Sequence, residues 1–294
     1  MNKYRNTILS SAFLLVLFSS CTKDAKNIRL PDFNPALVIN SFIAADMAVS
    51  DVTVTSPQRV FGDQSDIQSP GNLTGFISDG TERFELAVTE SDTSAQIFKL
   101  SSADIIIKEG TTYYLSISND KGLTAEASCT VPIKRDIKIE VDTVQELSYN
   151  DYWGRLASIS FKISIIDWPG ENNYYRMLCY YQSYGNPVYD YSSGKTDMPD
   201  IMYNDKGRDG EKILIRTLEP VGIPLDAPYC PDSSFLKIYL LNTDKEYNDF
   251  HQSLLNYSSG DQPFNEPSSV YSNITGGLGI FAAYTIDSLT FRIK

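Results

Sequence analysis

Short runs in which apolar and polar residues alternate constrain the fold of this chain more than any other feature. The clearest is Leu156–Ile166 (LASISFKISII), where every second residue from Ile159 to Ile165 is Ile or Phe. A period of two residues is that of a half-buried strand. Such runs recur about every ten residues with turn signals between them, which is typical of β-sandwiches. The predicted strands are Ala36–Ile43, Val52–Ser56, Phe84–Val88, Ile105–Lys108, Tyr113–Ile117, Ala125–Val131, Asp136–Val144, Leu156–Ile166, Tyr174–Tyr184, Leu236–Leu241 and Phe281–Ile293.

A chain of 294 residues has room for two domains. We expect a mainly β protein: an Ig-like or transthyretin-like β-sandwich over residues 31–133, which Pro132 closes, and a second β-rich sandwich domain over 134–294. The second domain carries one predicted α-helix near 243–257. Thr243 and Glu246 have capping-box spacing, and His251 lies beside the predicted apolar stripe. That stripe consists of Tyr247, Phe250 and Leu254.

Three glycines mark the last predicted turn. Gly276, Gly277 and Gly279 stand among large apolar residues and precede the final run. Glycine permits positive φ and close backbone contact. A phosphate-binding loop is excluded because no lysine follows the glycines and a strand, not a helix, follows them. We therefore predict a tight, partly buried bulge or hairpin turn that opens into the last strand.

The N-terminus has the pattern of a lipoprotein signal. Lys3 and Arg5 precede a short apolar run, and Leu17–Cys21 resembles a bacterial lipobox. We expect residues 1–20 to be removed, Cys21 to be lipidated, and residues 21–30 to form a tether. Acyl burial would then anchor the protein in the outer membrane, at the cell surface or facing the periplasm. A plain secretory signal with another cleavage site is the alternative.

Charge and histidine content exclude several classes of function. Without Lys3 and Arg5, the balance is 23 − 37 = −14, which is unsuited to nucleic acid. One histidine, His251, leaves no His-rich zinc site, and we expect no cofactor, no metal and no catalytic residues. Asn204–Gly210 is rich in oxygen ligands that suit Ca²⁺, but EF-hand spacing is absent. We prefer a hairpin turn around Asp209 and Gly210.

Cysteine and aromatic residues supply the other candidates. Cys129, Cys179 and Cys230 remain after Cys21, and Cys179 and Cys230 could form a disulfide in an oxidising compartment. The tyrosine-rich run Tyr174–Tyr184 is either a glycan- or peptide-binding face or simply a half-exposed strand. The loop Phe61–Gly75 is a second candidate binding segment. The tyrosine candidates are Tyr174, Tyr175, Tyr180 and Tyr181.

Two residues before the glycine turn are further candidates. Asn273 is a candidate contact residue, and Glu266 is the acid to test for a hydrolase with paired carboxylates. The alternative for Glu266 is a cap or hydrogen bond to a backbone turn.

The chain resembles the Bacteroidetes lipoprotein family known as domain of unknown function 4249. The most specific block is Asp261–Phe281, which contains Glu266-Pro267 and Ser272–Phe281 (SNITGGLGIF). The other matching segments are Cys21, Pro35–Asn40, Tyr113–Leu115, Val131-Pro132, Asn173–Arg176 and Asp209-Gly210. The resemblance implies an outer-membrane lipoprotein encoded beside TonB-dependent transporters, with no established catalytic residues. We expect a non-enzymatic accessory protein of such a transporter in nutrient uptake. The alternative is a free-standing surface module that binds glycan or peptide, and the ligand itself is unknown.

Overall fold

The structure is a computed structural model that describes residues 35–45, 47–57, 69–92, 94–151, 154–184, 195–197, 201–216, 221–225, 233–258 and 269–293. Within these ranges the chain is mainly β, with several sheets and one α-helix, as predicted. The elements are β1 (Val38–Ala44), β2 (Val49–Thr55), β3 (Leu73–Ser78), β4 (Arg83–Leu86), β5 (Val88–Ser91), β6 (Ala95–Ser101), β7 (Thr112–Asn119), β8 (Thr124–Thr130), β9 (Ile139–Asn150), β10 (Gly154–Ile166), β11 (Tyr174–Tyr184), β12 (Lys195–Asp197), β13 (Ile201–Asn204), β14 (Lys212–Arg216), β15 (Val221–Pro224), β16 (Ser233–Thr243), α2 (Lys245–Ser258) and β17 (Leu278–Arg292).

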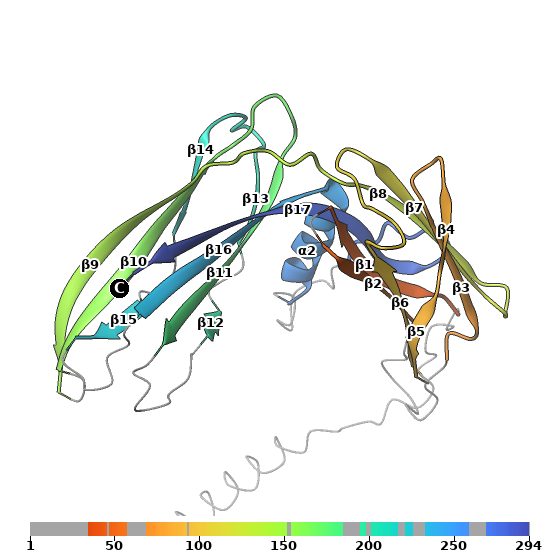
Figure 1. The fold of residues 1–294 in the computed structure, drawn as a ribbon, viewed down its shortest axis with the longest axis horizontal. Coiled ribbons are helices and arrows are strands. Elements are labelled where there is room, and N and C mark those ends of the chain that lie inside the picture. The colour runs from red at the N-terminus through yellow and green to blue at the C-terminus, as the bar shows by residue number, and fades with distance from the viewer. Residues whose placement is uncertain are drawn as a thin grey trace, which may run out of the picture.

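One long sheet runs through the molecule, and a smaller sheet lies in each half. The long sheet has the order β12-β11-β16-β17-β1-β2-β6-β5, with β13 also paired to β11. The first small sheet is β4-β3-β7-β8; in the second, β10 pairs with β14 and β15 on one edge and with β9 on the other. Figure 1 shows the resulting two arms of an arch, with β17 passing between them and α2 beneath it.

Strand β17 belongs to both arms. Its first half, Leu278–Tyr284, pairs parallel with β1, and Tyr284–Arg292 pairs antiparallel with β16. Phe281 lies in the core of the first arm, whereas Phe291 packs against the core of the second. The first core otherwise draws on residues 37–131 and Ile274, and the second on residues 137–240 and the end of β17. A single continuous strand therefore couples two hydrophobic cores.

The alternation in β10 is confirmed. The four Ile and Phe side chains from Ile159 to Ile165 are buried in the second core, while Lys162 is exposed. Each such side chain contributes roughly 1.5–3 kcal/mol when fully buried. Strand β11 coincides with the predicted run Tyr174–Tyr184.

Two predicted strands were wrong. Ile105–Lys108 is irregular, although Ile105 and Ile107 are buried. In place of hydrogen bonds to a neighbouring strand, this segment bonds to the Tyr113 hydroxyl. The hydroxyl accepts from Lys108 N at 2.8 Å and donates to the Ile106 carbonyl at 3.3 Å. The predicted strand Phe84–Val88 is divided, because β4 pairs with β3 in one sheet and β5 with β6 in another.

The glycine turn is tight and leads into the last strand, as predicted, but it is not a hairpin. Thr275 pairs with Glu126 at the edge of the first small sheet, and three residues later Leu278 N donates to the Leu37 carbonyl at 2.9 Å. The segment thus crosses from one sheet to the other, and β17 runs parallel to β1. A Cβ on Gly276 would lie 2.3 Å from the Thr124 carbonyl oxygen, so only glycine fits this crossing.

Helix α2 begins at Lys245, one residue later than an N-cap at Thr243 predicts. Thr243 is the last residue of β16, where its hydroxyl donates to the Tyr174 carbonyl at 3.3 Å, so it is not the N-cap. Asp244 caps the helix instead: its Oδ1 accepts from Tyr247 N at 2.8 Å. Tyr247 is buried and Phe250 half-buried, but Leu254 is 39% exposed and does not belong to the packed stripe.

Candidate functional site

Strand β11 presents its tyrosines to opposite faces. Tyr175 belongs to the second core, and Tyr181 is buried with its hydroxyl donating to Ser234 Oγ at 3.2 Å, so these two predicted binding residues are packing residues. Burial and a hydrogen bond to Asp167 raise the pKa of Tyr175. Tyr174 and Tyr180 are half-buried and lie on the opposite face, the one on which α2 packs. The strand is therefore half-exposed, and its more open face carries Tyr174 and Tyr180.

An aromatic groove lies on that face, across β11, β16 and β17. Its volume is about 430 Å³, within the range of small-molecule sites. The rings of Tyr180 and Tyr239 meet edge to face, with centroids 5.8 Å apart. The hydroxyl of Tyr284 donates to Met47 Sδ at 3.0 Å. The lining residues are Leu178, Tyr180, Lys237, Tyr239, Leu241, Tyr284 and Ile286.

Helix α2 bounds this face through a cluster around the single histidine. Arg176 donates to the Tyr247 hydroxyl, and its guanidinium lies 2.8 Å from His251 Nε2. Because a guanidinium can only donate, Nε2 accepts, and Nδ1 carries the hydrogen that it donates to the Tyr247 carbonyl at 3.0 Å. The Tyr247 and His251 rings stack at 4.2 Å. We interpret His251 as a structural residue that holds α2 on the sheet, in agreement with its predicted place beside the stripe.

The tyrosines give the aromatic groove both apolar and polar surface. Three phenolic rings offer flat apolar faces and hydroxyls together, and Lys237 adds one positive charge. Burial raises the pKa of Tyr284, so its hydroxyl stays protonated at neutral pH. The groove can thus stack against flat rings and exchange hydrogen bonds along its rim, which suits binding.

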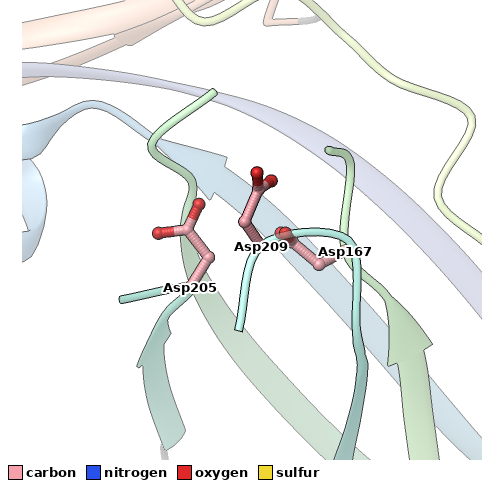
Figure 2. A group of neighbouring side chains, drawn as sticks. All are labelled: Asp167, Asp205 and Asp209. Atoms are coloured by element: carbon pink, nitrogen blue, oxygen red, sulfur yellow. The ribbon is translucent and has the colours of Figure 1, made fainter. Parts of the chain in front are cut away.

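A second polar group is the acidic cluster Asp167, Asp205 and Asp209 (Figure 2). One carboxylate oxygen of each lies within 4.8 Å of those of the other two. Asp167 and Asp205 are buried, although burial of unpaired charge is costly. Oxygen ligands grouped in this way are the kind that Ca²⁺ takes.

Backbone donors already engage each carboxylate of the acidic cluster. Asp167 accepts from Gly210 N at 2.8 Å, and Asp205 from Asn173 N at 2.8 Å. Asp209 accepts from Gly170 N at 2.7 Å. We therefore interpret the cluster as a clamp between the loop after β10 and the loop after β13.

The predicted hairpin around Asp209 and Gly210 was wrong. The flanking strands belong to different sheets, since β13 pairs with β11 and β14 with β10. The turn therefore connects two sheets. The sequence did not reveal that this turn brings Asp209 close to Asp167, which lies 42 residues earlier in the chain.

The remaining predicted residues make contacts within the fold or lie outside the described ranges, and the contact role of Asn273, which also lines a pocket beside β7 and β8, stays a prediction. Asn273 holds both backbone atoms of Phe281: Oδ1 accepts from its N–H at 3.0 Å, and Nδ2 donates to its carbonyl at 2.7 Å. Cys179 is buried in the second core. Cys21, Cys230, Glu266 and residues 61–68 of the predicted loop lie outside the described ranges. The disulfide of Cys179 with Cys230 thus stays a prediction.

Comparison with known protein families shows the family to which the chain belongs. The model of the family described as domain of unknown function (DUF4249) matches residues 24–290. The chain belongs to the DUF4249 family. The resemblance seen in the sequence is confirmed to that extent, and the lipoprotein and Bacteroidetes expectations stay predictions.

Similarity of this DUF4249 protein to solved structures is weak. A DUF4785 family protein from Legionella pneumophila is 7% identical with a TM-score of 0.26, and the alignment covers 70% of this chain and 52% of that one. The BSP domain of a biofilm-associated protein is 8% identical with a TM-score of 0.16, over 91% and 61% of the two chains. The DUF4249 chain thus spans about half the length of the first. None of the curated proteins matches it.

Proposed function

We propose that this DUF4249 protein is a non-enzymatic accessory protein of a TonB-dependent transporter, held at the outer membrane by lipid chains on Cys21. The observation that carries the proposal is the aromatic groove beside α2. A half-open groove with three tyrosines is a surface for holding a ligand or partner, since aromatic residues are enriched where proteins recognise one another.

Two further observations support a binding role. The single histidine is engaged by Arg176 and Tyr247. The carboxylates of the acidic cluster accept from backbone N–H groups, so they serve the fold. As a separate finding, the described part of the chain contains no helix that is long and apolar enough to cross a bilayer.

The test is affinity purification of the full-length, lipidated protein from its own membranes in a mild detergent, read by mass spectrometry. The proposal expects a TonB-dependent transporter in amounts comparable with the protein itself. A matched preparation with Cys21→Ser controls for the anchor, because it should lose the membrane fraction and with it the transporter. Recovery of the wild-type protein alone contradicts the proposal.

A free-standing glycan- or peptide-binding module is the second candidate, and the tyrosine composition of the groove favours it. Flat rings stack on Tyr180 and Tyr239, and the rim can exchange hydrogen bonds with hydroxyl or carbonyl groups. Screening of the purified protein against glycan and peptide arrays separates the candidates. Strong binding without any transporter, abolished by Tyr239→Ser, supports the second candidate over the first.

A further inference from the structure

The described strands at the sheet edges are short or partly covered, with one exception. An edge strand exposes unpaired N–H and C=O groups, and proteins limit this with short strands, bulges or covering segments. Strands β5, β12 and β13 at the ends of the long sheet have only 4, 3 and 4 residues. Strand β5 also pairs through an irregular register. In the first small sheet, β4 has 4 residues, and Thr275 bonds both backbone polar groups of Glu126 in β8; in the second, β14 and β15 have 5 and 4 residues.

Strand β9 is the exception. It has 12 residues and pairs along its whole length with β10 on one side only. No described strand pairs with its other edge. Figure 1 shows it at the outer side of its arm. At about 3.3 Å per residue, the free edge is roughly 40 Å long. Alternate residues of this edge point their N–H and C=O groups outward, where an added strand could bond to them.

The side chains of β9 form two rows of different chemistry. One row carries Glu140, Asp142 and Glu146, and the strand has no Lys or Arg. The other row ends in Leu147 and Tyr149, which are 71% and 74% exposed. Glu140 is already paired with Lys138 and Lys212, and these contacts lower its pKa to about 2. Asp142 lies opposite Lys162 on β10, whereas Glu146 lies opposite Ser158, so Glu146 is the acid of this row that no cation of β10 faces.

This chemistry selects the kind of strand that fits. A second copy of the chain in an antiparallel pair would set Asp142 against Glu146 in one of the two registers of fullest overlap, which disfavours that pairing. An added strand that alternates basic and apolar residues would place a base beside Glu146 and its apolar side chains beside Leu147 and Tyr149. Charge complementarity of this kind gives specificity.

We propose that β9 is a docking edge that accepts an extended segment of a partner protein, with alternating basic and apolar residues, as an added β-strand. Main-chain hydrogen bonds along the edge supply affinity, and the two side-chain rows supply selectivity, as in other cases of strand addition. The aromatic groove takes no part in this docking, so the proposal stands or falls separately from the proposed function.

The experiment uses the full-length protein in detergent and a synthetic ten-residue peptide of alternating lysine and valine or threonine. Binding is measured by fluorescence anisotropy, and the bound segment is located by amide hydrogen exchange. The proposal expects one peptide per chain and slowed exchange in Ile139–Asn150 only. The same peptide methylated on alternate backbone nitrogens should not bind, because it cannot complete the ladder.

Variants of the protein sharpen the test. Glu146→Lys should weaken peptide binding by about tenfold, since it replaces an attraction by a repulsion. Asp51→Lys is the matched control, since it makes the same change of charge on an exposed residue of β2 and should leave binding unaltered. Three results overturn the proposal: no binding at all, binding that is indifferent to peptide methylation or to Glu146→Lys, or self-association of the protein through β9 without peptide.

Discussion

Substitution of Gly279 by alanine tests whether the glycine turn is fixed by close backbone packing. Gly279 has a φ of +105°, and a Cβ there would lie 1.9 Å from the carbonyl oxygen of Ile39, its partner on β1. A side chain at positive φ costs about 1–2 kcal/mol. Overpacking of a tight core adds about 1–3 kcal/mol. We therefore expect Gly279→Ala to lower the free energy of unfolding by about 2–5 kcal/mol.

Gly122→Ala is the control that separates these two contributions. Gly122 lies in the turn between β7 and β8 with a φ of +82°, and a Cβ there would meet nothing within 4 Å. It should therefore lose only the contribution of about 1–2 kcal/mol from positive φ. Both variants are measured by urea unfolding, followed by circular dichroism, of identically prepared protein. Equal destabilisation of the two variants would refute the close contact between β17 and β1.

Three further predictions concern the polar contacts. Arg176→Gln should loosen α2, because it removes the charged donor to the Tyr247 hydroxyl; faster amide exchange within Lys245–Ser258 checks this, and unchanged exchange contradicts it. Burial raises the pKa of Asp244 from 3.8 to about 8. Its contribution to the free energy of unfolding is therefore fully present below about pH 4 and is lost as the pH rises through 8. Thermal unfolding from pH 5 to pH 9 should show this fall in the wild type, and Asp244→Asn should flatten it. Asp167→Asn should cost about 1–3 kcal/mol in urea unfolding, because the amide nitrogen replaces one carboxylate oxygen and cannot accept, so the bond from either Gly210 N or the Tyr175 hydroxyl is lost. The exposed Asp209→Asn should cost less.

Local patterns predicted the strands of this protein better than their partners. The period of two in β10 and β11 depends on neighbouring residues alone, so both strands could be identified from the sequence. The pairing of β17 with β1 joins the two ends of the chain, and no local signal encodes it. For the same reason, alternation identified the tyrosine-rich strand but could not tell which of its faces the second small sheet covers.

The helix cap shows how tertiary contacts choose between two good local solutions. Thr243 and Asp244 are both suitable N-caps by residue type. Thr243 pairs with Tyr174 in the β11–β16 ladder, which leaves the cap to Asp244. The acidic cluster was missed for a related reason: Asp167, Asp205 and Asp209 converge only because two sheets bring their loops together.

The most direct test purifies the wild-type protein and a variant that lacks the groove tyrosines from native membranes. It decides whether the aromatic groove is the surface through which this DUF4249 protein acts. The variant is Tyr180→Ser with Tyr239→Ser, and Tyr114→Ser, a 53% exposed tyrosine of the other arm, is the control. We expect a TonB-dependent transporter to accompany the wild type and the control in similar amounts, and its recovery with the double variant to fall at least about tenfold, the loss typical of a central aromatic contact. Equal recovery with all three proteins, or no transporter with any, would contradict the proposed role of the groove.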